Sequence, residues 1–532
     1  MAVRWDTESH NKESMKKDNR TRIMERRARS TAALLMVSAL MVAPLVLPAC
    51  SRPADRPNVL FVVWDTVRAD RLSVYGCDTP TTPFLEAFAR GARVYDNCTS
   101  TGSSTVPSHG AMFTGLLPRE HGANNSFKHL ADAHATLAEI FRDSGYATYL
   151  FSANPHISAD ENFSQGFDVE EHPWDDRYRE RALGMIRQKA NPLDANTDLN
   201  RMLRVNRPDN WYIKNCGKLA EHGLLDWLGK KPEGRPYFAF LNYMEAHQPY
   251  APPIEIRSRL MTPAQLERSA QIDRSWINMW CYTFGLHDYS AADLEILARL
   301  YDACLIELDG LFEELIASLD AGGYLDNTIV VLVGDHGEHL GEHHMLDHQY
   351  SLYEPLLRVP LIVRYPEKIE AGRETRPVVN FDLFPTLLEL AGLEPPSGPS
   401  RHALSLLDAD ADRLRLAEYP SDLDQPIEKV KKIYSRWDPT PFRRRMTALY
   451  DGAFKYIHAS DGTHELYDLS VDPGETRNLI VTEGADRKRF HETLKRLLNE
   501  TVPFDYAGAD GPDLSDEQIE RLRSLGYGGG RR

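Results

Sequence analysis

The chain has 532 residues, with 62 Lys and Arg against 78 Asp and Glu, which gives a formal net charge of −16 at pH 7. This length predicts two or three domains, one of them large. The acidic balance disfavours binding to nucleic acid or to other polyanions. An anionic substrate would therefore need a local positive site, and a cation held by clustered carboxylates would provide one.

The N-terminal segment differs in composition from the rest of the chain. Residues 21–29 are basic, residues 31–49 are small or apolar, and the segment ends in Leu-Pro-Ala-Cys50. This pattern predicts a bacterial lipoprotein signal peptide over residues 1–50, with translation starting at Met1 or Met24 and a lipid on Cys50. The mature protein would then be anchored to a membrane of the cell envelope, on the periplasmic side or in the outer membrane. The alternative is an uncleaved membrane helix, because an apolar run of about 20 residues just spans a bilayer.

Five further cysteines are scattered along the chain without a CxxC pair: Cys77, Cys98, Cys216, Cys281 and Cys304. This spacing predicts neither a disulfide framework nor a structural zinc site, and it leaves room for one disulfide at most.

A polar tether at 51–56 leads into alternating strand and helix patterns. Short apolar runs rich in Val and Phe are typical of strands buried on both faces of a sheet, and they occur at 58–66, 236–243, 328–334 and 358–364. Helical patterns lie between them, at 82–90, 134–145 and 291–322. The alternation predicts an α/β domain over residues 57–405, in which helices cover both faces of a large mixed, mostly parallel sheet.

Two regions depart from this pattern. Residues 168–235 are rich in charges, Asn and Pro, and they predict a partly helical excursion that leaves the sheet and forms a lid facing the substrate. Residues 406–505 contain short aromatic strands, a DPG turn and a helical pattern at 484–500. They predict a smaller α+β domain with an antiparallel sheet, followed by a tail at 506–532.

Acidic residues follow two of the apolar strands, at the carboxyl ends where ligand-binding groups collect in such sheets. Asp65 follows the first strand, and Asp335 with His336 follows the third. A single Asp after a strand is usually a helix cap, but two of them with an adjacent His are harder to explain as caps. Burying such charge is unfavourable unless it is paired or bound to a cation. We therefore expect these three residues to bind a divalent metal ion.

Thr105 precedes a helical stretch at 107–114, where Pro107 occupies a position that helices tolerate. Ser and Thr are common as plain helix caps. A hydroxyl at a helix N-terminus also faces backbone N–H groups that hold an anionic ester and stabilise its transition state. Since a hydroxyl is a weak nucleophile until a metal or a base removes its proton, we expect Thr105 to bind the same ion.

Four motifs occur in the order of a known family, over roughly residues 57–480: RPNVLFVVWDTVRADRLSVYG, TGLLPREHG, VVLVGDHGEHLGEHH with LYEPLLRVPLIVRYP, and ELYDLSVDPGETRNL. They resemble segments of the sulfatases of the alkaline phosphatase superfamily. The resemblance implies an αβα sandwich of the alkaline phosphatase type and the hydrolysis of sulfuric or phosphoric esters. It also implies a divalent cofactor, with calcium favoured and zinc, manganese or magnesium as alternatives.

The chain departs from this family at the nucleophile. Sulfatases carry Cys-X-Pro-Ser-Arg, whose Cys or Ser is oxidised to formylglycine, whereas this chain has Thr-Val-Pro-Ser-His from Thr105 to His109. Threonine cannot be converted, so no formylglycine is expected. The tandem Asp-Asp of the family is Asp65-Thr66 here, and its Gly-Lys-X-His element is replaced by FSANPHIS. The Thr motif resembles that of nucleotide pyrophosphatases and phosphodiesterases, which use the Thr hydroxyl directly.

The resemblance also suggests roles for other residues. His247 would contact the ester and protonate the leaving group. His348, at a Lys position of the family, would assist the leaving group or, with His247, ligate a second metal as in two-zinc relatives. Those relatives have an Asp where this chain has Tyr243, which favours a single ion. Asn125 and His109 are expected to contact the substrate.

Together these patterns predict a metal-dependent ester hydrolase that forms a covalent ester on Thr105. Phosphodiester chemistry is favoured over sulfate chemistry, because a sulfate ester on Thr lacks the hydrate-collapse route of formylglycine. Two alternatives stay open: an envelope transferase that passes the group from Thr105 to an acceptor, and a degenerate sulfatase that binds anionic glycans without turnover. The expected substrate is a small-molecule, glycan or lipid ester, and the expected oligomeric state is a monomer or a homodimer.

Overall fold

A computed structural model describes residues 56–189, 216–396, 402–408, 413–420, 424–480 and 484–506. The predicted signal peptide with Cys50 and nearly all of the predicted tether and tail lie outside these residues. Within the described ranges, none of the helices has the length and apolar character needed to cross a membrane. All five cysteines in these ranges are free thiols.

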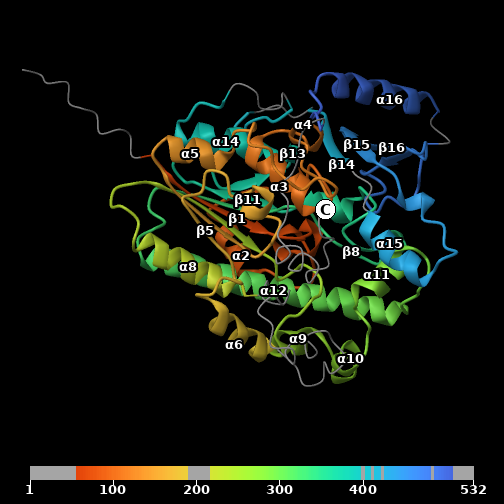
Figure 1. The fold of residues 1–532 in the computed structure, drawn as a ribbon, viewed down its shortest axis with the longest axis horizontal. Helices are drawn as coiled ribbons and strands as arrows, with labels where there is room; N and C mark the ends of the chain where they lie inside the picture. Colours follow the sequence, from red (N-terminus) through yellow and green to blue (C-terminus); the bar gives the residue numbers. More distant parts are fainter. Residues whose placement is uncertain are drawn as a thin grey trace, which may run out of the picture. The chain divides into compact units, whose positions relative to one another are not determined.

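A central eight-stranded sheet has the order β12-β2-β11-β7-β1-β6-β4-β5 (Figure 1). Its middle strand β1 (Asn58–Trp64) pairs in parallel with β6 (Tyr237–Tyr243) on one side and β7 (Thr328–Gly334) on the other. β4 (Ala147–Ser152) extends the parallel block, whereas β11 (Leu361–Arg364) runs antiparallel to β7. The predicted mixed, mostly parallel sheet is confirmed. The edge strands are β5 (Val169–Glu171) and β12 (Gly372–Glu374), and β2 (Arg93–Tyr95) lies between β12 and β11.

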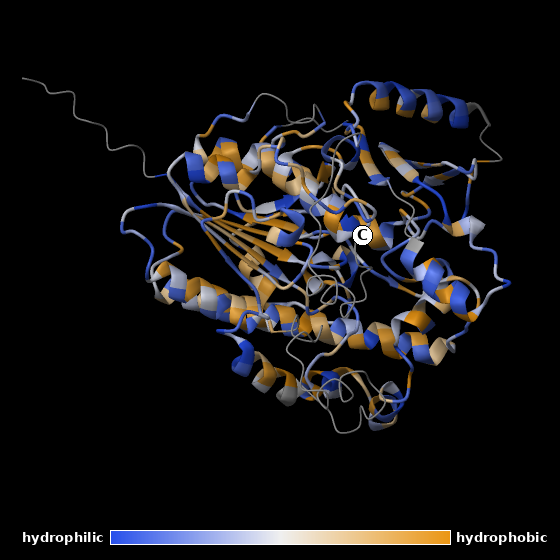
Figure 2. Cartoon of the chain, in the orientation of Figure 1, coloured by the Kyte–Doolittle hydropathy of each residue, from blue (hydrophilic) through white to orange (hydrophobic). Residues whose placement is uncertain are grey.

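Helices cover both faces of this sheet, which explains why its central strands are apolar throughout (Figures 1 and 2). Alternate side chains of β1 enter two separate cores. Leu60, Val62 and Trp64 pack with α12 (Ala291–Ala321) and α8 (Lys218–Leu228). Val59, Phe61 and Val63 pack with α3 (Thr105–Thr114), α5 (Leu137–Asp143) and α14 (Leu383–Ala391).

The region 168–235 is less separate from the sheet than predicted. β5 pairs with β4 at the sheet edge, and α8 buries Leu219 and Leu224 in the main core. Charged residues of this region lie inside the fold because they find partners there: the Glu171 carboxylate accepts hydrogen bonds from two buried tyrosines. α6 (Arg179–Lys189) follows, and residues 190–215 lie outside the described part, so the lid stays a prediction.

The predicted antiparallel sheet at the C-terminal end is present as β14-β15-β16-β17, covered by α16 (Gly484–Asn499). Its strands are Arg415–Tyr419, Met446–Asp451, Phe454–Ala459 and Glu465–Asp468. Its core includes Ala111 of α3 and Leu117 just beyond that helix. In addition, Gly102 bridges to Glu418, and the Glu418 carboxylate accepts the backbone N–H of Arg119. The small sheet therefore supports the segment on both sides of Thr105.

Shorter elements connect these parts. The helices are α2 (Pro83–Ala89), α4 (Pro118–His121), α9 (Ile254–Leu260), α10 (Pro263–Ser269), α11 (Trp276–Thr283), α13 (Glu354–Leu357) and α15 (Asp424–Ile433). The strands are β3 (Cys98–Thr99), β8 (His339–Leu340), β9 (Leu346–Asp347), β10 (Arg358–Val359) and β13 (Val378–Val379).

Candidate metal centre and active site

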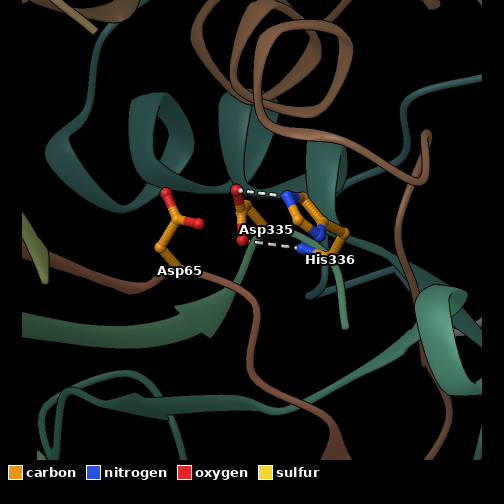
Figure 3. Close-up of side chains that lie close together, drawn as sticks. All are labelled: Asp65, Asp335 and His336. Carbon is orange, nitrogen blue, oxygen red and sulfur yellow. Dashed lines mark hydrogen bonds and ion pairs between the residues drawn. The ribbon is translucent and has the colours of Figure 1, made fainter. Parts of the chain in front are cut away.

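The carboxyl ends of β1 and β7 bring the three predicted metal ligands together (Figure 3). Asp65 follows β1, and Asp335 and His336 follow β7; the strands are neighbours and parallel, so their ends meet at one edge. All three side chains are fully buried, and their ligand atoms lie within 4.8 Å of one another. Two ligands about 2.1 Å from one ion lie roughly 3 to 4 Å apart. Asp335 Oδ2 and His336 Nε2, at 3.4 Å, match that spacing.

Each carboxylate has one oxygen in hydrogen bonds and one without them. Asp65 Oδ2 accepts from the Asn154 and Asn242 amides at 2.9 and 3.3 Å. Asp335 Oδ1 accepts from the backbone N–H of Thr66 at 3.0 Å and of the following histidine at 2.8 Å. Asp65 Oδ1 and Asp335 Oδ2 are buried and accept no hydrogen bond from the described residues. Because an unpartnered buried carboxylate oxygen is destabilising, these two atoms fit a divalent ion.

The electrostatics of the group agree with a metal ligand set. Burial, and then the charge of Asp335, raises the pKa of Asp65 to about 6, and burial raises the pKa of Asp335 to about 7. Burial lowers the pKa of His336 to about 3, so the ring is neutral. Its Nδ1 lies 2.9 Å from the Gly337 carbonyl oxygen, which only accepts. Nδ1 therefore carries the proton, and Nε2 presents its lone pair to the site.

Thr105 begins α3 with its hydroxyl directed at this group. Its Oγ1 lies 3.3 Å from His336 Nε2 and 3.4 Å from Asn154 Nδ2. The preceding Ser104 is the N-cap of the helix, so Thr105 is also at the positive end of the helix dipole. The structure thus brings the predicted nucleophile and the predicted ligands together, and the chemical role of Thr105 stays a prediction.

The two other predicted catalytic residues lie beside the ligands. The His348 ring is centred 4.6 Å from the His336 ring and 5.0 Å from the His247 ring. His247 follows β6, which is the other neighbour of β1, and its Nδ1 lies 2.7 Å from the Gln248 carbonyl oxygen. Both histidines are therefore within the same buried cluster as the metal ligands.

The structure favours a supporting role for His109 over the predicted substrate contact. The ring is fully buried and packs against Phe113 and Phe240, with centroids 6.1 and 5.9 Å away. Its Nδ1 lies 3.0 Å from the Thr105 carbonyl oxygen, and burial lowers its pKa to about 3. A neutral imidazole in the core does not replace the charge of the Arg that sulfatases have here. Asn125 is half-buried and donates to Ser104 Oγ at 3.1 Å, so it lies next to the nucleophile segment.

Our sequence analysis missed several residues that hold this site. Asn154 and Asn242, at the ends of β4 and β6, orient Asp65. Ser108 donates to the Asp335 carbonyl oxygen at 2.7 Å, and Asn380 donates to Ser108 at 2.8 Å. A usable signal for the two asparagines was their place near the end of a buried strand, because Asn242 is the penultimate residue of β6, Asn154 lies two residues beyond β4, and both strands run parallel to β1.

The αβα fold and the buried group of candidate metal ligands at this edge are those expected of an ester hydrolase, and comparisons with known proteins identify the family. Residues 57–393 match the model of the sulfatase family, and residues 341–502 match the N-sulphoglucosamine sulphohydrolase C-terminal model. The chain belongs to the sulfatase family and is thus a hydrolase of ester bonds. The family generally binds a divalent metal ion, for which Asp65, Asp335 and His336 are the candidate ligands.

Similar curated proteins cover most of the chain. An N-acetylglucosamine-6-O-sulfatase of Bacteroides thetaiotaomicron is 25% identical, over 87% of this chain and 90% of its own. Human arylsulfatase K is 27% identical, over 89% and 88%. Among solved structures, a phosphonate monoester hydrolase of Agrobacterium radiobacter has a TM-score of 0.63 at 19% identity, covering 87% and 99%. Another, in complex with its substrate D-glucosamine-2-N,6-O-disulfate, has a TM-score of 0.62 at 20% identity, covering 86% and 99%.

Proposed function

We propose that the protein is a metal-dependent hydrolase of phosphoric or sulfuric esters in which Thr105 attacks the ester and carries the transferred group. The observation that supports this most is the position of Thr105 Oγ1, 3.3 Å from His336 Nε2 and beside two carboxylates that each have an oxygen without a hydrogen bond from the described residues. When bound there, a divalent ion lowers the pKa of a hydroxyl and neutralises charge on the ester.

Asp65, Asp335, His336 and Thr105 would hold this ion. Kinship with the sulfatases implies calcium, but calcium prefers oxygen ligands throughout. An imidazole nitrogen suits zinc or manganese. We therefore propose a transition-metal ion at this site.

Side chains and backbone groups of the chain itself would carry out the remaining steps of the reaction. Thr105 forms the bond to phosphorus or sulfur, while the N-terminal N–H groups of α3 and the amide of Asn125 bind the non-bridging oxygens. His247 donates a proton to the leaving oxygen. In the second step His247 takes a proton from water, the water oxygen attacks the covalent ester, and the Thr105 oxygen leaves.

Phosphoric esters, and diesters in particular, are the favoured substrates. Formylglycine releases sulfate by collapse of its hydrate, and a Thr ester has no such route, so water must attack the central atom directly. Phosphonate monoester hydrolases are among the structural neighbours, as are enzymes of glycan sulfates. Those neighbours share the fold, and the substrates in their names define the classes to test first.

A panel of p-nitrophenyl esters tests the proposal: a sulfate, a phosphate monoester, a phosphodiester and a phosphonate monoester, each with calcium, manganese or zinc. We expect the phosphodiester and the phosphonate monoester to have the highest kcat/KM. A preference for the sulfate would contradict the phosphoester assignment. Turnover that depends on an added glycan or lipid hydroxyl would indicate a transferase, and no turnover together with no adduct on Thr105 would indicate a binding protein.

Substitution of His247 by Gln is expected to lower kcat by about 100-fold for esters with alkyl leaving groups, since an alkoxide must be protonated as it departs. In a single turnover the same variant should release p-nitrophenol at close to the wild-type rate, because nitrophenolate leaves without a proton, whereas its steady-state rate falls because His247 also takes the proton from water in the second step. The measurement is a plot of the single-turnover rate of leaving-group release against leaving-group pKa. His222→Gln, an exposed position on α8, is the control, and an equal loss for all leaving groups would refute proton donation by His247.

A further inference from the structure

A second group of ligating side chains lies beside the first. Glu338, Asp347 and His348 are buried, and one ligand atom of each lies within 4.8 Å of the others. Glu338 follows β7, and the short β8–β9 hairpin brings Asp347 and His348 back toward it. His348 Nδ1 lies 2.8 Å from Asp347 Oδ1 and 3.5 Å from Glu338 Oε1. The 3.5 Å separation matches that of two ligands on one ion, whereas the 2.8 Å separation is that of an ion pair, which a bound metal would replace.

Tyr250 supplies an independent observation at the same place. Its side chain is 1% exposed, and its hydroxyl makes no hydrogen bond to the described residues. Buried tyrosine hydroxyls usually have a partner. Burial raises the pKa of Tyr250 well above its ordinary value, and the charges of Glu338 and Asp347 raise it further. The hydroxyl therefore has an unmet hydrogen-bonding capacity within the electrostatic reach of this group.

The charge balance of the two groups also calls for a second cation. Asp65, Asp335, Glu338 and Asp347 carry four negative charges when ionised. One divalent ion at the first group leaves two of these charges, and the adjacent Arg68 is already paired with Asp70 and Glu342. A protonated His348 would still leave the centre negative before an anionic ester arrives. A second divalent ion beside a neutral His348 makes the centre neutral.

We propose that Glu338, Asp347 and His348 bind a second divalent cation, so that the protein has a two-metal centre. The two groups are adjacent, because the centres of the His336 and His348 rings are 4.6 Å apart. The expectation of a single ion rested on Tyr243, which stands where two-metal relatives have an Asp four residues before the histidine. In this chain the carboxylates for a second ion come instead from the segment after β7. The catalytic role of the second ion would be a contact to the leaving-group side of the ester, and this role rests on the proposed function. The number of bound ions does not depend on that function.

Metal content tests this inference without reference to activity. Chelated protein is titrated with zinc or manganese by calorimetry, and the bound ions are counted by mass spectrometry after gel filtration. We expect two ions per chain in the wild type, one in Asp347→Asn and two in Asp288→Asn, which alters an exposed carboxylate near the same hairpin. His348→Gln is the second variant if Asp347→Asn does not fold by circular dichroism.

The inference would be overturned if the wild type binds a single ion that is lost in Asp65→Asn and kept in Asp347→Asn. In that case a proton on His348 is the partner of the Glu338 and Asp347 carboxylates. Although burial lowers the pKa of His348, Asp347 and Glu338 raise it well above its ordinary value, so a proton is the direct competitor of the metal. Two bound ions in a protein that hydrolyses no ester would refute the proposed function and support the two-metal centre.

Discussion

Substitution of Thr105 by Ala is expected to lower kcat by at least about 1,000-fold on every ester that the wild-type protein hydrolyses. The reason is that Thr105 Oγ1 is the hydroxyl at 3.3 Å from His336 Nε2 and 3.4 Å from the amide of Asn154, inside the ligand cluster. The measurement combines steady-state rates with rapid acid quench and peptide mass spectrometry. The wild type should show a phosphoryl or sulfuryl adduct on Thr105, and the variant should show none.

Two further variants distinguish the loss of the nucleophile from a loss of structure in the helix. Thr105→Ser keeps a hydroxyl at the same place and should retain part of the activity and the adduct. Thr114→Val lies at the other end of the same helix, where its hydroxyl donates to the Gly110 carbonyl oxygen at 2.6 Å. It should lose about 1 kcal/mol of stability and keep the wild-type kcat. An adduct on another residue, or wild-type turnover by Thr105→Ala, would rule out Thr105 as the nucleophile.

Chelation of the bound metal is expected to reduce kcat by about 100-fold or more and to lower the Tm. Asp65 Oδ1 and Asp335 Oδ2 are buried without a hydrogen-bond donor among the described residues, so the proposed ion would be their partner in the folded state. A ligand present at 100 times its Kd stabilises the native state by about 2.7 kcal/mol, which a thermal shift detects. Zinc or manganese should restore activity and Tm more fully than calcium, because His336 offers a nitrogen ligand.

Two aspartate substitutions accompany this experiment, one at a proposed metal ligand and one at a buried carboxylate elsewhere in the fold. Asp335→Asn should abolish both the activity and the metal-dependent rise in Tm. Asp309→Asn alters a buried carboxylate that accepts the N-terminal N–H groups of α2 at Phe84 and Leu85, both at 2.8 Å. This variant should be less stable and keep the full metal-dependent rise. Chelated protein with undiminished turnover and Tm would contradict a metal-dependent mechanism.

The central sheet could be predicted because its strands are apolar on both faces. β1, β6 and β7 are completely or almost completely buried, so their composition alone distinguishes them from surface strands. The edge strands β5 and β12 could not be predicted, since they are three residues long and contain Glu or Arg. Their pairing depends on distant strands and leaves no local pattern.

The residues of the candidate site likewise include some that could be predicted from the sequence and some that could not. Asp65, Asp335 and His336 could be predicted because a charged residue directly after a wholly apolar strand is unusual. Asp347 could not, because a sequence such as HHMLDH resembles an exposed polar loop, yet the residue is buried and accepts a hydrogen bond from Trp280 Nε1 at 2.9 Å. The burial of His109 against Phe113 and Phe240 likewise depends on tertiary packing that no local pattern records.

The backbone bridge between Gly102 and Glu418, together with the hydrogen bond from the Arg119 N–H to the Glu418 carboxylate, connects the C-terminal sheet to the segment that carries Thr105. Exchanging that sheet for the corresponding part of a relative would shift the backbone that presents Thr105, even though the two regions are about 300 positions apart. Chimeras of such proteins should therefore be joined so that the α3 segment and its supporting strand are inherited from one parent.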